Sequence, residues 1–203
     1  KTIVNIVWFK RDLRSSDHAP LNEAALGEYP VLPIYVFEPD YWMQDDAAFR
    51  HWEFIKQSLE FLREDLSQLG QALVFRKGKI LDVFEDLKKD FSINAIYSHQ
   101  ETGNAWTYER DKRVRYWGRI NSVKILEYQN NAIIRGLLDR DNWADERDKF
   151  MSKPIVEKPN IQPLEIDLSQ ISVDIDFRGN SVKNNQQVGG GERGRRHLQS
   201  FFQ

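Results

Sequence analysis

Charged and aromatic side chains follow three apolar segments of the sequence directly. Lys10 and Arg11 follow the first segment, Glu38 and Tyr41 the second, and Glu101 comes three residues after a third. Such a set offers a planar polar ligand ring faces on which to stack and charges that fix its orientation. The alternative is that these charges pair with one another and only order the loops. The positions of these residues alone favour this second interpretation.

Several common kinds of chemistry lack their motifs. No G-x-G-x-x-G follows the first apolar segment, and neither a G-x-x-x-x-G-K-[ST] loop nor a G-x-S-x-G elbow occurs. No predicted strand precedes the glycine run Gly189–Gly191, as one would in a phosphate-binding loop. We interpret this run as a linker or as the start of a helix. His99 and Glu101 could exchange a proton with a ligand, but no nucleophile stands out beside them. We predict no catalytic residue and no metal site, and expect capping, surface or packing roles for His18, His51, His99 and His197.

Short apolar runs alternate with segments of helical period. Five β-α units in order favour a doubly wound, Rossmann-like α/β fold with a five-stranded parallel sheet and helices on both faces. Ligands of such folds bind at the carboxyl ends of the strands, where the polar residues lie. The predicted strands are Ile3–Phe9, Val31–Phe37, Ala72–Phe75, Ala95–Ser98 and Val123–Glu127. The predicted helices are Pro20–Leu26, Trp52–Leu69, Ile80–Phe91 and Trp106–Ile120.

The regular alternation stops after about residue 130. We place the α/β domain at 1–135 and a long irregular connector at 136–190, which contains Pro154, Pro159 and the polar run Asn180–Gln187. An amphipathic helix is expected to begin near residue 191. Its apolar side, Leu198, Phe201 and Phe202, needs a partner surface.

Composition limits the remaining classes. The chain has 203 residues, no cysteine and a formal net charge of −2. Disulfides and thiolate chemistry are therefore excluded. No apolar stretch is long enough to span a membrane, and we expect a cytoplasmic protein because no targeting segment is recognised. A domain that binds nucleic acid unaided usually has a basic excess, so any DNA contact would come from a local patch or another part of the protein.

The order of the motifs resembles the cryptochrome/photolyase family of flavoproteins. The opening run at the end of the first strand is the most specific part of the match, and the match extends over essentially the whole chain. The matching segments are Trp8–Arg14 (WFKRDLR), Asp17 with Pro20-Leu21, Val36–Pro39, Arg50, Phe54, Ser58-Leu59, Leu62, Glu101–Asp111 and the Gly-Gly-Gly-Glu run at 189–192.

The resemblance implies an N-terminal antenna domain of a DNA photolyase, a class of enzyme that repairs pyrimidine dimers with light. Residues 191–203 would then begin a helical FAD-binding domain. That domain would be the partner of this one, would carry the catalytic flavin and would make most contacts with damaged DNA. The fragment alone would be inactive. Blue-light signalling of the cryptochrome type remains an alternative. A stand-alone nucleotide- or flavin-binding module is another, and the oligomeric state stays open.

The resemblance also implies two antenna positions. A deazaflavin or flavin would lie at the carboxyl edge of the sheet, whereas a methenyltetrahydrofolate would lie between domains against Glu109. The residue before Glu109 is Tyr108, where folate-binding members often have Asn. The candidate cofactor-binding residues are Trp8, Lys10, Arg11, Phe37, Glu38, Tyr41, Arg50, Glu101, Tyr108 and Glu109.

Overall fold

The computed structural model describes residues 1–137, 141–173 and 188–202. Five strands form one parallel sheet in the order β3-β2-β1-β4-β5. The predicted α/β class with a five-stranded parallel sheet is confirmed. The strands are β1 (Thr2–Phe9), β2 (Val31–Phe37), β3 (Val74–Lys77), β4 (Phe91–His99) and β5 (Lys124–Tyr128).

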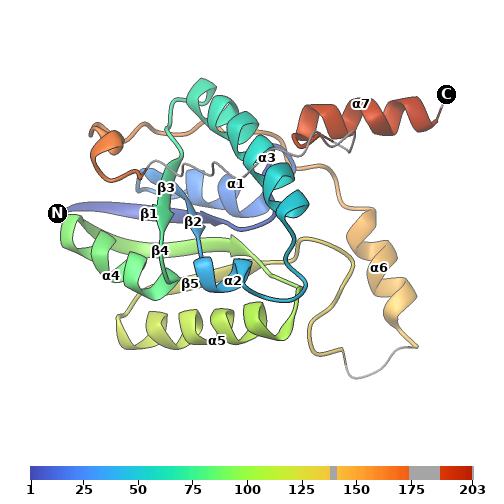
Figure 1. Cartoon of the computed structure of the whole chain (residues 1–203), viewed down its shortest axis with the longest axis horizontal. Coiled ribbons are helices and arrows are strands. Elements are labelled where there is room, and N and C mark those ends of the chain that lie inside the picture. Colours follow the sequence, from blue (N-terminus) through green and yellow to red (C-terminus); the bar gives the residue numbers. More distant parts are fainter. Residues whose placement is uncertain (138–140, 174–187, 203) are drawn as a thin grey trace.

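Helices cover both faces of this sheet, as Figure 1 shows. Helices α1 and α3 pack on one face, and α4 and α5 pack on the other. The described helices are α1 (Ala19–Ala25), α2 (Pro39–Trp42), α3 (Phe49–Gln68), α4 (Ile80–Asp90), α5 (Ala105–Ile120), α6 (Trp143–Met151) and α7 (Gly191–Phe201), with a 3-10 turn, η1 (Leu168–Gln170).

Strand β1 shows how the sequence forms two cores. Its side chains alternate between the faces, so Val7 and Phe9 join the α1/α3 core while Ile6 and Trp8 join the α4/α5 core. A central strand buried on both sides reads as a continuous apolar run for this reason. In β2, Pro33 pairs only with β1, because pairing with β3 begins one residue later at Ile34. The missing N–H of Pro33 therefore disturbs no bond to β3.

The connector lies against the domain where it is described. Ile161 is buried in the α1/α3 core, and Leu164 and Leu168 are buried in the α4/α5 core. It contains the short helix α6 and the turn η1, in agreement with the expectation of only short helices. The polar run Asn180–Gln187 lies outside the described residues.

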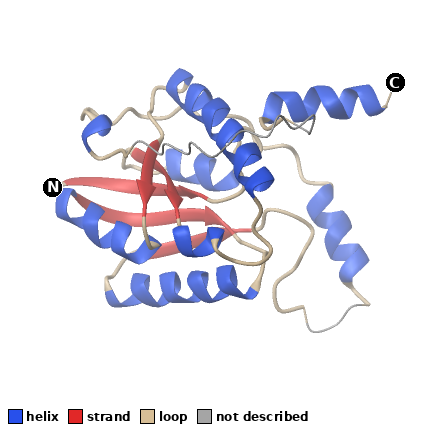
Figure 2. Cartoon of the chain, viewed as in Figure 1, coloured by secondary structure: helices blue, strands red, loops and turns tan. Residues whose placement is uncertain are grey.

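Helix α7 begins where the chain crosses α3 at close range. The Gly189 N–H donates to Oε1 of Gln57 at 2.8 Å, and a Cβ at Gly189 would overlap with the Phe54 carbonyl. From this crossing α7 points away from the sheet (Figure 2). Its apolar residues Phe201 and Phe202 are 83% and 78% exposed. No helix among the described residues is long and apolar enough to cross a membrane.

Candidate functional site

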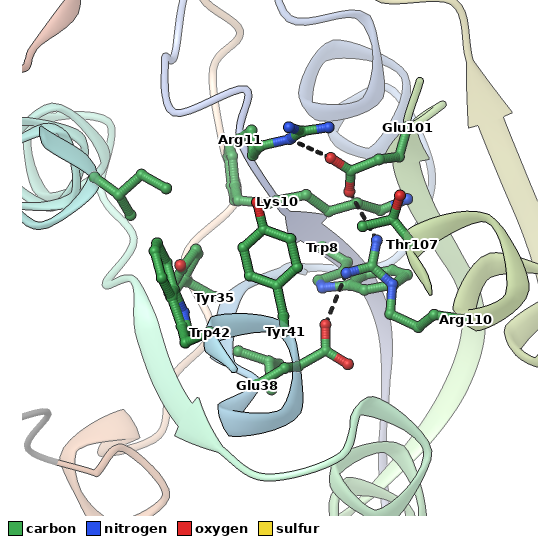
Figure 3. Close-up of a pocket in the computed structure, with 13 residues that line it drawn as sticks. Trp8, Lys10, Arg11, Tyr35, Glu38, Tyr41, Trp42, Glu101, Thr107 and Arg110 are labelled. Carbon is green, nitrogen blue, oxygen red and sulfur yellow. Dashed lines mark hydrogen bonds and ion pairs between the residues drawn. The ribbon is translucent and has the colours of Figure 1, made fainter. Parts of the chain in front are cut away.

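The polar residues that follow the strands meet at the carboxyl edge of the sheet. Strand order reverses between β1 and β4, which is the place where doubly wound sheets form a ligand crevice. Residues after β1, β2 and β4 line a small pocket there, together with the first turns of α5 (Figure 3). Its lining is Trp8, Phe9, Lys10, Arg11, Tyr35, Val36, Glu38, Tyr41, Trp42, Ile55, Glu101, Thr107 and Arg110.

A buried guanidinium connects the charges of this pocket. Arg110 donates to Glu38 Oε2 at 2.7 Å and to Glu101 Oε2 at 2.8 Å. The same side chain donates to Oδ1 of Asp111 through Nε and Nη2, at 3.1 and 3.0 Å. Lys10 Nζ lies 3.1 Å from Asp111 Oδ2. Since a buried charge left without a partner costs several kcal/mol, each member depends on the others.

Burial and ion pairing shift the pKa values of the groups in this network in opposite directions. Burial alone would lower the pKa of Arg110, but Glu38, Asp111 and Glu101 outweigh it and raise that pKa. Burial raises the pKa of Glu38, and Arg110 offsets only part of the effect because three carboxylates share its guanidinium. Burial would also raise the pKa of Asp111, which Lys10 and Arg110 instead hold below its usual value.

Aromatic rings fill the space that the charges leave. The ring of Trp8 lies beneath two cations, with Lys10 Nζ at 4.3 Å and the Arg110 guanidinium carbon at 4.7 Å from its centroid. Helix α2 places Tyr41 across the pocket (Figure 3), 5.7 Å from Trp106 and 5.2 Å from Trp42 between ring centroids. The short helix thus covers the site with its own side chains.

A second buried cluster supports the turn after β1. Asp12 Oδ2 lies 2.8 Å from Nε2 of His18 and 2.6 Å from Nδ1 of His99. Burial would raise the pKa of Asp12, but these hydrogen bonds hold it well below its ordinary value. Burial lowers the pKa of His18 despite the carboxylate.

These three side chains also offer metal-ligand atoms within 4.8 Å of one another. Nδ1 of His18, however, accepts the N–H of Leu21 at 3.1 Å and caps α1. The ring proton therefore lies on Nε2, which then donates to Asp12 and has no lone pair for a metal. The arrangement suits a structural cluster, in which His18 caps α1, one of the three roles that the sequence left open for the histidines.

The pocket does not fit a flavin or deazaflavin in this conformation. Its cavity measures about 30 Å³, whereas pockets for such ligands measure about 300 Å³ or more. The network occupies the space: Arg110 is 7% exposed, and Glu38 and Glu101 are 7% and 8% exposed. A ring system could enter only after α2 and Arg110 had moved. This geometry agrees with the second interpretation of the sequence, in which these charges pair with one another.

The structure brings together part of the predicted set. Phe37 is buried one layer away, with ring centroids 5.1 Å from Trp52 and 6.0 Å from Trp42. Arg50 is exposed at the start of α3, and Tyr108 and Glu109 are exposed on α5, outside the pocket. The predicted residues that line the pocket are Trp8, Lys10, Arg11, Glu38, Tyr41 and Glu101.

The central residue, Arg110, was missing from the predicted set. Thr107, Arg110, Asp111, Val114 and Trp117 are all buried at helical spacing on α5. This periodicity was a signal that could have assigned Arg110 and Asp111 to the inner side of the helix.

Glu109 and Arg113, and likewise Asp111 and Arg115, lie four residues apart on α5, a spacing that favours ion pairs along a helix. The structure does not form them. Asp111 binds Lys10 and Arg110, and Arg115 binds Glu127 at 2.6 Å. Arg113 reaches only the backbone carbonyl of Glu109. Burial of Asp111 against the sheet removes it from the reach of its helix neighbour.

Comparison with known proteins identifies the family. The sequence profile of the DNA photolyase family matches residues 5–135. The chain is 34% identical over 104 residues to the blue-light photoreceptor PHR2 of Arabidopsis thaliana, covering 49% of this chain and 23% of that protein. It is 31% identical over 101 residues to cryptochrome DASH of Synechocystis, covering 47% of this chain and 21% of that protein. The chain thus spans less than a quarter of the length of these curated relatives.

Solved structures share the fold. The crystal structure of a Synechocystis cryptochrome superposes with a TM-score of 0.72 at 22% identity, covering 98% of this chain and 46% of the other. A class III photolyase from Agrobacterium tumefaciens gives 0.68 at 19% identity, covering 84% of this chain and 38% of the other. The profile match and the fold agree, and we conclude that the chain belongs to the DNA photolyase family, with the architecture of its N-terminal α/β domain.

Proposed function

We propose that the chain is the N-terminal domain of a light-driven DNA photolyase that repairs pyrimidine dimers. In this proposal residues 1–135 form the α/β domain, 136–190 connect it to the rest, and 191–203 begin a helical domain that binds FAD and damaged DNA. The α/β domain itself does no bond chemistry. Its buried charges are paired with one another.

The apolar side of α7 carries this proposal. Leu198, Phe201 and Phe202 are 57%, 83% and 78% exposed, and soluble proteins rarely leave such a patch uncovered. A helical domain that follows α7 would cover it. The connector fixes the direction of α7 at Gly189 and Gly190, whose missing side chains let the backbone pass α3.

The test uses the protein purified from its source cells. We expect an intact mass well above 24.0 kDa and bound flavin. We also expect the protein to convert thymine dimers in an oligonucleotide back to thymines under blue light but not in the dark. A native product of 24.0 kDa would contradict the division into two domains.

Blue-light signalling is a second candidate, favoured by the names of the relatives. Both curated relatives described above are named as a photoreceptor or a cryptochrome. In this case the native protein would bind flavin and respond to light, but irradiated oligonucleotides would keep their dimers. The repair assay therefore separates the two candidates.

For the antenna we propose a folate against Tyr108 and Glu109. Both side chains are exposed, and the exposed fraction of Tyr108 is 49%. Among the described residues, the Glu109 carboxylate accepts a hydrogen bond from Lys112 Nζ alone, at 3.0 Å. A ring could stack on the tyrosine and donate a hydrogen bond to the carboxylate, with the remaining contacts supplied by the helical domain. The pocket around Arg110 has no comparable room, and the larger hollow of about 280 Å³ beside it is lined by no tryptophan, tyrosine or phenylalanine ring.

Titration of the native protein with methenyltetrahydrofolate, followed by its near-ultraviolet absorption, tests this position. Glu109→Gln should weaken binding, and the matched variant Glu60→Gln on the exposed side of α3 should not. Loss of binding in both variants, or in neither, would remove Glu109 from the site. Binding of a flavin or deazaflavin in place of the folate would move the antenna to the sheet edge.

A further inference from the structure

The two edge strands of the sheet differ in whether another described segment of the chain forms hydrogen bonds with them. The strand order places β3 and β5 at the edges. An edge strand presents unpaired backbone N–H and C=O groups, to which another extended segment can pair. The structure shows what happens to these groups at each edge.

At the β3 edge the connector supplies the missing partner. Val173 N–H donates to the Phe75 carbonyl at 2.8 Å, and Phe75 N–H donates to Oγ of Ser172 at 3.0 Å. Arg76 adds a bond to the Ile171 carbonyl at 3.2 Å. This part of the connector combines apolar and acidic residues, as in Ile166, Asp167 and Leu168. An acidic, partly apolar segment thus closes one edge within the same chain.

At the β5 edge the described residues supply no such partner. Residues 124–127 pair with β4, and none of the backbone bonds between described residues links them to any other segment. The bond from the Gln100 N–H to the Tyr128 carbonyl at 2.7 Å lies on the inner side and continues the pairing with β4. The outward backbone groups of β5 are therefore available within the part of the chain that the structure describes.

A basic groove runs between this edge and the outer side of α5. It has a volume of about 680 Å³. Its cations are Arg113, Arg119 and Lys124, together with Lys112, which pairs with Glu109 at 3.0 Å. The further cation, Arg115, is neutralised by Glu127. The groove is thus basic in a chain whose net charge is −2.

One aromatic ring stands among these cations. Tyr116 is 60% exposed, and the Arg119 guanidinium carbon lies 5.7 Å from its ring centroid. A single lysine on an edge strand would simply discourage pairing. A groove with several cations, a ring and an open backbone edge offers recognition instead, because it supplies charge, apolar area and hydrogen bonds together.

We propose that an extended acidic segment of a partner protein adds to β5 as a sixth strand and lies in this groove. Its backbone pairs with the outward groups of residues 124–127. Its acidic side chains face α5 and contact Arg113, Arg119 and Lys124, and the apolar side chains between them point to the opposite face of the sheet. A nucleic acid would use the cations but not the backbone edge, so the edge favours a peptide.

The test measures binding of a fluorescent peptide of alternating glutamate and valine, about eight residues long, to the chain of 203 residues by anisotropy. We expect binding that weakens as salt is added. A second peptide of the same sequence, N-methylated at alternate residues, keeps the charge but loses backbone donors on one edge. Methylated peptides covering both alternations are used, and we expect one of them to lose binding.

The variant Arg113→Ala/Arg119→Ala/Lys124→Ala should bind the unmodified peptide about tenfold more weakly. The matched variant Lys56→Ala/Arg63→Ala/Lys153→Ala makes the same change in net charge elsewhere and should bind normally. Circular dichroism checks that both variants fold. Hydrogen exchange should show slower exchange of outward amides in 124–127 when the peptide is added.

Three results would overturn the proposal. The first is undiminished binding of both methylated peptides, which would show that charge alone acts. The second is equal weakening by the two triple variants. The third is tighter binding of oligothymidylate than of the peptide with dependence on the same three cations, which would make the groove a nucleic-acid surface.

Discussion

Helix α5 has charges on two sides, and the two sides differ in kind. On the inner side, Arg110 and Asp111 are 7% and 2% exposed and take part in a network of paired groups. On the outer side, Lys112, Arg113 and Arg119 are exposed and outnumber their carboxylate partner. Neighbours in the sequence thus have opposite roles. The comparison teaches that burial, rather than residue type, decides whether a charge is structural or available to a partner.

The largest effect should come from breaking the inner network. Arg110→Ala leaves Glu38, Glu101 and Asp111 without their shared guanidinium, and we expect a loss of about 3–5 kcal/mol in the free energy of unfolding. Urea denaturation measures it, with Arg113→Ala on the outer side as the control. A loss below about 1 kcal/mol for Arg110→Ala would show that water replaces the guanidinium easily.

A smaller effect should come from the contact of α5 with β5. A Cβ at Gly118 would overlap with the side chain of Ile125 and lie 2.8 Å from the Val123 carbonyl oxygen. We expect Gly118→Ala to destabilise the fold by about 1–3 kcal/mol through overpacking. The control is Gly194→Ala in α7, where a Cβ meets no atom within 4 Å. Equal unfolding temperatures of the two variants would show that β5 shifts to accommodate the added methyl group without loss of stability.

The Asp12–His18–His99 cluster gives a pH-dependent effect. Burial places the pKa of His18 in the folded state below its unfolded value of about 6.5. The unfolded chain therefore takes up this proton first, so the contribution of His18 is present above about pH 6.5 and is lost as the pH falls below it. His18→Asn keeps a capping side chain and should reduce the loss of stability between about pH 7.5 and 5.5. An unchanged pH profile in urea titrations would contradict the burial argument.

The smallest effect on stability should come from the outer side of α5. Arg119→Ala removes an exposed cation that contacts only the ring of Tyr116 in the described structure, and we expect a change within about 0.5 kcal/mol. The same urea series measures it. A larger loss would mean that the outer cations have a structural role, and the contrast between the two sides of α5 would disappear.

Periodicity predicted the strands and helices because each has an apolar face that must be buried. The boundaries were less certain. Phe91 was assigned to the end of a helix, but α4 ends at Asp90 and Phe91 starts β4 with its ring buried in the α4/α5 core. A helix that passes into a strand without a loop leaves no turn residue to mark the change.

The sequence predicted where the candidate site lies, but not whether the space between its residues is open or filled. The strand ends identified Lys10, Glu38 and Glu101 correctly as neighbours, since parallel strands bring their carboxyl ends to one edge. Whether the space between them is open depends on Arg110 and on the angle of α2. Neither depends on local sequence, because both follow from packing between segments far apart in the chain.

The closure of the β3 edge has a consequence for synthesis of the protein. Phe75 and Ser172, which bond across that edge, are 97 residues apart. At ordinary rates of translation, about 5–20 residues per second, roughly 5–20 seconds pass between them. During that interval the outer edge of β3 would be uncovered, which is the state in which edge strands join foreign chains. A slower ribosome would lengthen this exposure, so the yield of folded domain should depend on the codons between these two positions.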